Sequence, residues 1–170
     1  MKKSIQLLVT LVLVTFSSSV FAQNSADFRG PNTLNVGIIS HLGVGSLGVQ
    51  ADYEIAQLGQ DFTIGASAYY QGWSDTHYNY SYFGVGARVR WYADRVLGIT
   101  DNRWDVFASG DLGFRFGNAS GKGDLSNVSS STVNPLYLGI GIGGKFHIND
   151  KISLQAIIGS GAQFGVAFQL

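Results

Sequence analysis

Apolar and polar residues alternate along most of the chain, and the last nine residues show the alternation without a break. The apolar positions there are Ala162, Phe164, Val166, Phe168 and Leu170, with small or polar residues between them. A period of two places successive side chains on opposite faces of an extended backbone, so the pattern predicts a β-strand with one apolar face. An apolar strand with an open edge is prone to aggregate, and we therefore expect both edges of this strand to be paired.

Seven further segments alternate in the same way, and short stretches of Gly, Asn, Asp and Ser separate them. The alternation thus predicts an all-β chain with an even number of strands, which can close into an antiparallel up-and-down barrel. The eight predicted strands are Thr33–Leu42, Leu47–Ala56, Phe62–Gln71, Tyr80–Tyr92, Trp104–Gly117, Leu136–Ile148, Lys151–Ile158 and Ala162–Leu170.

The two faces of these strands differ in a way that separates a membrane barrel from a soluble one. One face carries bulky apolar residues and no charge in any of the eight strands. The other face is rich in glycine and carries charges of both signs: Asp52, Glu54, Arg88, Arg90, Asp105, Asp111, Arg115 and Lys145. A transmembrane barrel has this arrangement, with lipid outside and a polar interior. Lipid also requires every backbone polar group to be paired, which a closed sheet achieves.

The connections predict the orientation of the barrel. If both termini are periplasmic, the outer connections are Gly43–Ser46, Gly72–Asn79, Asn118–Pro135 and Gly159–Gly161, and the longest and most polar one faces outside, as expected for such barrels. The inner connections are then Gln57–Asp61, Ala93–Arg103 and Asn149–Asp150. Aromatic residues near the strand ends predict an outer girdle of Tyr69, Tyr70, Trp73, Tyr78, Tyr80 and Tyr82 and an inner girdle of Tyr53, Trp91, Tyr92 and Trp104.

The composition fits one membrane-embedded domain. Charged residues make up 13% of the 170 residues, against about 25% in ordinary soluble domains. Many of the 23 glycines lie within strand-like segments, where they permit strong curvature and close backbone approach. Cysteine is absent, so disulfides and thiolate metal sites are excluded. The formal charge is +0, without a basic patch that would suit nucleic acid.

The N-terminus predicts a secretory signal. Lys2 and Lys3 precede a short apolar stretch, and small residues then lead to Ala22. The apolar stretch is about half the ~20 residues that a spanning helix needs. We therefore expect residues 1–22 to be a cleaved signal peptide and residues 23–170 to form the barrel domain.

Together these features resemble the small eight-stranded bacterial outer-membrane barrels of the OmpA/OmpX-like superfamily. The resemblance covers the whole mature chain and rests on the signal segment, the alternating strands, the 104–110 stretch, the glycine-rich Gly139–Lys145 strand and the terminal strand. It implies an integral protein of the bacterial outer membrane, in contact with outer-membrane lipids and expected to be a monomer.

The resemblance also gives the terminal strand a second role. Such proteins end in alternating apolar residues that the barrel-assembly machinery recognises, usually with Phe last. Here that assembly signal would be Phe164, Val166, Phe168 and Leu170, with Leu in the final position. The outer loops would contact an extracellular ligand or other envelope components.

The eight charged residues of the polar face are the main candidate site. An eight-stranded barrel has a lumen just wide enough for side chains to fill. Four acidic and four basic groups can therefore form a paired plug, which makes the protein a non-enzymatic barrel with a closed interior. The alternative is a narrow passive channel for ions or small solutes.

Other motifs carry less chemistry. Two Gly-x-Gly-x-x-Gly matches begin at Gly43 and Gly139, but both continue into alternating strands, whereas a dinucleotide site needs a helix there. The three histidines lie in separate segments without metal-ligand spacing, so no metal or cofactor is expected. Ser74-Asp75-Thr76-His77 places a nucleophile and a base in one outer loop. This loop leaves a lipid-modifying enzyme as a third hypothesis.

Overall fold

The structure is a computed structural model that describes residues 28–41 and 45–170. The predicted signal peptide, residues 1–22, lies outside the described residues, as do residues 43 and 44 of the predicted Gly43–Ser46 connection. No helix among the described residues is long and apolar enough to cross a membrane.

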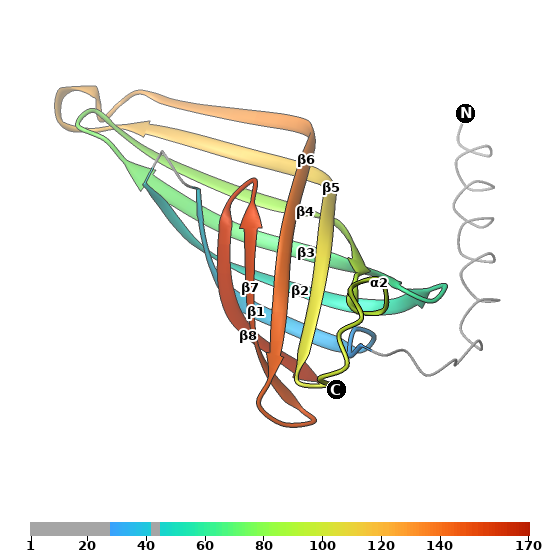
Figure 1. Ribbon diagram of the computed structural model, residues 1–170. Helices are drawn as coiled ribbons and strands as arrows, with labels where there is room; N and C mark the ends of the chain where they lie inside the picture. The colour runs from blue at the N-terminus through green and yellow to red at the C-terminus, as the bar shows by residue number, and fades with distance from the viewer. Residues whose placement is uncertain (1–27, 42–44) are drawn as a thin grey trace, which may run out of the picture.

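Eight antiparallel strands form a closed barrel in which each strand pairs with its neighbours in sequence and β1 pairs with β8 (Figure 1). The alternating segments are thus confirmed as the strands of an up-and-down barrel. The strands are β1 Thr33–His41, β2 Ser46–Leu58, β3 Phe62–Ser74, β4 Tyr78–Tyr92, β5 Trp104–Gly121, β6 Ser129–His147, β7 Ile152–Gly159 and β8 Ala162–Gln169.

The predicted long outer loop Asn118–Pro135 is wrong, because both flanking strands continue through most of it. β5 and β6 remain paired from Asn118↔Ser131 to Ser120↔Ser129, and only residues 122–128, with the 3-10 turn η1 Gly123–Leu125, connect them. Backbone hydrogen bonds hold this ladder together, and they need no apolar alternation in the side chains. The Ser- and Asn-rich sequence therefore carried no strand signal.

The end of the barrel opposite the start of β1 and the end of β8, which is the predicted outer end, is uneven. β6 pairs with β7 only from Gly141 onward, although its pairing with β5 continues to Ser129. The strands β3 to β6 consequently extend well past the turn between β7 and β8, as Figure 1 shows. One side of the barrel wall is therefore lower than the other.

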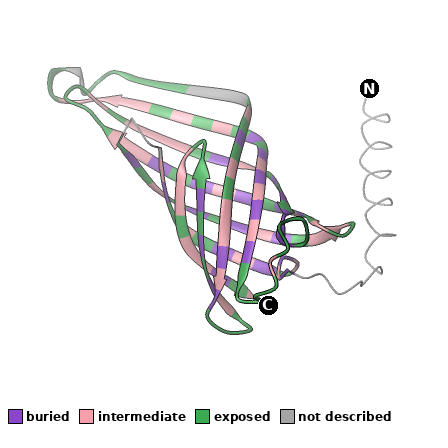
Figure 2. Cartoon of the chain, viewed as in Figure 1, coloured by how far each residue is buried: buried purple, intermediate pink, exposed green. Residues whose placement is uncertain are grey.

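Burial is inverted relative to a soluble domain (Figure 2). The outward positions are large apolar side chains, with Leu138 75% and Ile140 74% exposed. The inward positions of the same strands are polar, with Lys145 0% and Arg90 1% exposed. This confirms the assignment of the two faces and is the arrangement of a barrel whose outer surface is apolar.

The predicted aromatic girdles are partly wrong. Tyr70, Trp91 and Trp104 do face outward, at 54%, 36% and 48% exposure. Tyr69 and Tyr92 are buried, at 8% and 1% exposure. Strand parity is the reason, since Tyr92 shares its face with Arg88 and Arg90 of β4.

Parity also assigns the rest of the predicted outer girdle. Tyr78, Tyr80 and Tyr82 share the inward face of β4, and Trp73 stacks on Tyr80 and Tyr82 at centroid distances of 4.8 and 5.1 Å. These rings therefore line the inner side of the protruding strands instead of forming a band around the barrel.

The Ala93–Arg103 connection contains the one-turn helix α2, Asp94–Leu97, which ends at Gly98 with a positive φ of 64°. The Asp94 carboxylate accepts a hydrogen bond from the backbone N–H of Val106 at 2.8 Å. Arg103 bonds to Asp101 and lowers the pKa of that carboxyl to about 2. Local polar contacts thus order this long connection against the inner rim.

The seam between β1 and β8 brings two glycines face to face. Gly37 pairs with Gly165, and a Cβ on Gly165 would lie 2.2 Å from the carbonyl oxygen of Val36. That distance is far below van der Waals contact, so the two strands can approach this closely only because a side chain is absent.

Gly165→Ala is therefore expected to destabilise the closed barrel by about 1–3 kcal/mol, because the added methyl group forces the seam apart. Urea unfolding of the refolded barrel in lipid vesicles measures this cost. Gly110→Ala is the matched control, since nothing lies within 4 Å of a Cβ at that position. Equal midpoints for the two variants would contradict the close-packed seam.

Candidate functional site

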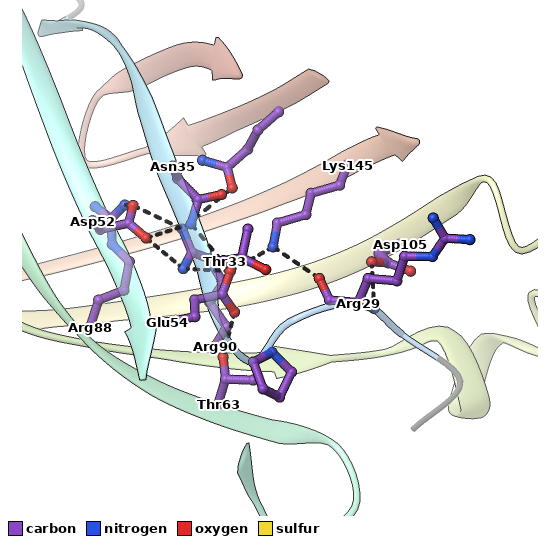
Figure 3. Close-up of polar contacts among 12 residues, drawn as sticks. Arg29, Thr33, Asn35, Asp52, Glu54, Thr63, Arg88, Arg90, Asp105 and Lys145 are labelled. Atoms are coloured by element: carbon purple, nitrogen blue, oxygen red, sulfur yellow. Dashed lines mark hydrogen bonds and ion pairs between the residues drawn. The ribbon is translucent and has the colours of Figure 1, made fainter. Parts of the chain in front are cut away.

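Six of the eight predicted lumen charges form one continuous network inside the barrel. Figure 3 shows the part of it formed by Asp52, Glu54, Arg88, Arg90 and Lys145. Three carboxylates and three cations alternate along it, so the network is neutral as a unit. Its members come from β2, β4, β5 and β6, and the order of contacts is Asp111, Arg88, Asp52, Arg90, Glu54 and Lys145.

Asp52 is the centre of the network. Arg88 donates from Nη1 to Asp52 Oδ1 at 2.6 Å, and Arg90 donates from Nη1 to Asp52 Oδ2 at 2.8 Å. The Asn35 amide donates to Asp52 Oδ2 at 2.8 Å. Arg88 also bonds to both oxygens of Asp111, at 2.7 and 3.1 Å. Both arginines are consequently held in fixed positions across the lumen.

Glu54 closes the network toward the inner end. Lys145 donates to Glu54 Oε1 at 2.5 Å, while the hydroxyls of Thr63 and Tyr92 each donate to Glu54 Oε2 at 2.8 Å. Lys145 also donates to the Tyr92 hydroxyl at 2.8 Å. Each buried charge in this region therefore has a charged partner and neutral partners, which a buried ion pair needs to offset its loss of hydration.

The other two predicted lumen charges stand apart from the network. Asp105 accepts from the backbone N–H of Arg29 at 3.1 Å and contacts His147 Nε2 at 2.8 Å. Arg115 lies nearer the outer end, where its Nε donates to the Tyr69 hydroxyl at 2.8 Å. The alternation of the sequence placed all eight residues on one face, but it could not show which would be neighbours.

Phe28 closes the lumen at its inner end, an arrangement that the sequence pattern does not predict. Phe28, in the lead-in before β1, stacks on Tyr92 with ring centroids 3.9 Å apart, and Tyr92 contacts Phe107 at 5.5 Å. Phe28 is 6% exposed. Lys145 also reaches the backbone oxygen of Arg29, at 3.4 Å. The lead-in thus folds back into the barrel, although it has no alternation that would predict this.

The structure also places Ser153, His147 and Asp105 in contact, a combination that the sequence analysis missed. His147 Nδ1 lies 2.6 Å from Ser153 Oγ, and its Nε2 lies 2.8 Å from Asp105. Ser153 is the second residue of β7 and is only 7% exposed. A serine nucleophile must be accessible to substrate, so this trio serves to pair buried polar groups.

The outer loop at residues 74–77 does not form a triad. Asp75 accepts hydrogen bonds from the backbone N–H groups of His77 and Tyr78, at 2.8 and 2.7 Å, so its carboxylate orders the turn. The Ser74 hydroxyl bonds to Asn79 and to Lys122. Within the described residues, no group of three or more His, Cys, Asp and Glu residues could hold a metal ion.

Comparisons with known proteins agree with this architecture. No protein-family model and no curated protein sequence matches the chain. Among solved structures, Neisserial surface protein A (NspA) is similar with 12% identity and a TM-score of 0.51, over 81% of this chain and 94% of that one.

Two further structures are similar over comparable lengths. The Ail protein of Yersinia pestis has 12% identity and a TM-score of 0.49, over 81% of this chain and 98% of that one. The N-terminal β-barrel domain of Pseudomonas aeruginosa OprF has 14% identity and a TM-score of 0.48, over 82% and 98%. With the closed barrel and its inverted faces, the chain has the fold of the small eight-stranded outer-membrane barrels.

Lys145→Met is expected to destabilise the barrel by about 3 kcal/mol, because it leaves a buried carboxylate without its closest cation. Adding Glu54→Gln to the same chain restores charge balance and should recover much of the loss. Denaturant unfolding of the wild type, both single variants and the double variant gives the coupling energy. Lys151→Met, at an exposed position, is the control; additive effects of the two buried changes would contradict the network.

Proposed function

We propose that the protein is an integral barrel of the bacterial outer membrane with a plugged polar lumen, whose outer strands and loops interact with the cell exterior or support the envelope. The observation that carries this proposal is the inverted burial of the barrel. A continuous surface of exposed Leu, Ile, Val and Phe would aggregate in water, and contact with lipid removes that cost.

Strand lengths support a membrane location. Spanning strands in tilted barrels have about 9–11 residues. β1 has 9 residues and β2 to β6 have 13 to 19, whereas β7 and β8 have 8 each. Six of the eight strands therefore reach or exceed the spanning length, β7 and β8 are one residue short of it, and β3 to β6 continue beyond the apolar zone.

The plugged lumen is favoured over the channel by the density of polar contacts and by the inner seal. The guanidinium groups of Arg88 and Arg90 cross the lumen to Asp52, and Phe28 covers the inner end. A conducting path would have to break neutral, hydrogen-bonded ion pairs.

The contacts of Ser74 and Asp75 at the outer turn bear on the enzyme hypothesis. Both side chains are engaged in hydrogen bonds that order the turn, and this supports a protein that is not an enzyme.

A shift of the unboiled sample on detergent gels, relative to the boiled sample, tests the membrane-barrel proposal. We expect the folded protein to be extracted from outer-membrane fractions only with detergent and to migrate differently before boiling. Solubility without detergent and identical mobility in both samples would exclude a membrane barrel.

Planar-bilayer recording separates the plug from the channel. The wild-type protein, reconstituted at high protein density, is expected to show no discrete conductance steps. Phe28→Ala and Arg90→Ala serve as opened variants, because they remove the inner seal and one ion-paired side chain. Reproducible steps from the wild type would favour the channel instead.

We further propose that the terminal strand is the signal for the barrel-assembly machinery, with Phe164, Val166, Phe168 and Leu170 as its apolar positions. Leu170 is 74% exposed at the end of the β8 ladder, where its N–H donates to the backbone oxygen of Asn32 at 2.9 Å. The side chain is thus available to a partner while the backbone is fixed.

Leu170→Phe is expected to insert at least as well as the wild type, and Phe168→Ser with Leu170→Ser should reduce insertion several-fold. Quantitative blotting of the folded form in outer-membrane fractions measures both. The same double change should leave refolding in detergent largely intact, which separates recognition from stability. Clearly poorer insertion of Leu170→Phe would argue against this role.

A further inference from the structure

Arg115 on β5 differs from the other lumen cations, because within the described residues it has no carboxylate in ion-pair contact. Its Nε donates to the Tyr69 hydroxyl at 2.8 Å, and its two Nη groups make no hydrogen bond to another described residue. Asp111 lies four residues before Arg115 on the same face of β5, and its carboxylate accepts hydrogen bonds from Nε and Nη2 of Arg88. Among the described residues, Arg115 is therefore a lumen cation without an ion-paired carboxylate, and its Nη donors are unused.

Three tyrosine rings surround this guanidinium, each lying on a glycine of the neighbouring strand. A Cβ on these glycines would lie 2.2, 2.7 and 2.9 Å from the rings, so only glycine allows the rings to lie where they do. The cross-strand pairs are Tyr69↔Gly84, Tyr82↔Gly117 and Tyr137↔Gly113. The three glycines therefore determine where the tyrosine rings lie around Arg115.

The rings hold the guanidinium without neutralising it. The Arg115 Cζ lies 5.2 Å from the ring centroid of Tyr137, 5.8 Å from that of Tyr82 and 6.0 Å from that of Tyr69. Cation–π contacts of this length stabilise a positive charge and orient it. They leave the planar pair of Nη donors, which matches two oxygens of an anion.

A cavity of about 50 Å³ adjoins these residues, and Arg115, Tyr69 and Tyr137 line it together with the ion pair of Arg88 and Asp111. At roughly 10–15 Å³ for each water-sized occupant, this is room for one small oxyanion group. Leu138 of β6 and the β7–β8 turn at Ser160 and Gly161 also line the cavity. It therefore lies at the low side of the barrel wall.

The outer surface of the barrel beside this cavity is apolar. Leu136, Leu138 and Ile140 of β6 point outward at 58%, 75% and 74% exposure, although β6 has no β7 partner before Gly141. An amphiphile could lay its hydrocarbon chain along this strip while its head group reaches into the lumen. A free anion could reach the same place from the outer mouth.

We propose that Arg115, with Tyr69, Tyr82 and Tyr137, forms a binding site for a phosphate group that enters the lumen at its outer, low side. The two Nη groups bind two phosphate oxygens, and the tyrosine rings keep the guanidinium in position. The phosphate is carried either by a lipid head group or by a soluble phosphorylated ligand. Only the lipid source depends on the membrane location proposed above.

Isothermal titration calorimetry on the full barrel, refolded in uncharged maltoside micelles, tests this site with two probes at constant ionic strength: inorganic phosphate and dodecyl phosphate. We expect saturable binding to the wild type and at least a tenfold loss of affinity in Arg115→Gln. Arg103→Gln, at an exposed position on the inner side, is the matched control and should bind as the wild type does.

The two probes distinguish the sources, since tighter binding of dodecyl phosphate assigns the site to a lipid and equal binding assigns it to a soluble ligand. The gel shift of unboiled samples verifies that each variant is folded. If Arg115→Gln does not fold, Arg115→Lys keeps the charge but loses the two-oxygen fork, and it should also bind several-fold more weakly.

The proposal is overturned if the wild type binds neither probe, or if the variant and the wild type bind equally. Both results are independent of where the protein resides in the cell, because the assay uses the folded barrel in micelles. A failed fractionation experiment would therefore remove the lipid source and leave the site itself to be judged by the titration.

Discussion

Closure of the sheet between β1 and β8 is the constraint on which the rest of the structure depends. Eight backbone pairs, from Thr33↔Gln169 to Ser40↔Ala162, remove the two edges that the chain would otherwise expose. An apolar outer surface is tolerable only when no unpaired N–H or C=O group accompanies it, because lipid cannot hydrogen-bond to either. The glycine pair Gly37↔Gly165 in this seam lets the closing strands approach.

Closure in turn decides what the interior must contain. A ring of eight strands leaves too little space for bulk water, so side chains have to fill the lumen and satisfy one another. Three carboxylates and three cations do so as a neutral unit, with Phe28 covering the inner end. At the outer end, tyrosine rings that lie against glycines of neighbouring strands surround Arg115, and a cavity remains beside them.

Alternation predicted each strand and both faces because the lipid-facing positions tolerate no charge over the whole height of the apolar surface. The alternation gives no strand signal where that requirement ends. Residues 118–121 and 129–135 belong to strands that pair through their backbones, although their polar sequence predicts a loop. The position of Tyr92 near a strand end predicts a girdle residue, but its parity with Arg88 and Arg90 assigns it to the interior.

The class of fold, the strand order and the inward face of every lumen charge can be read from the alternation alone, because a period of two and a charge-free face follow from local geometry and from the cost of burying charge in lipid. Which charges meet depends on the folded barrel. Partners such as Glu54 and Lys145 are 91 residues apart, and the relative stagger of the strands brings them together. Among the described residues, the same stagger left Arg115 on β5 without a carboxylate in ion-pair contact.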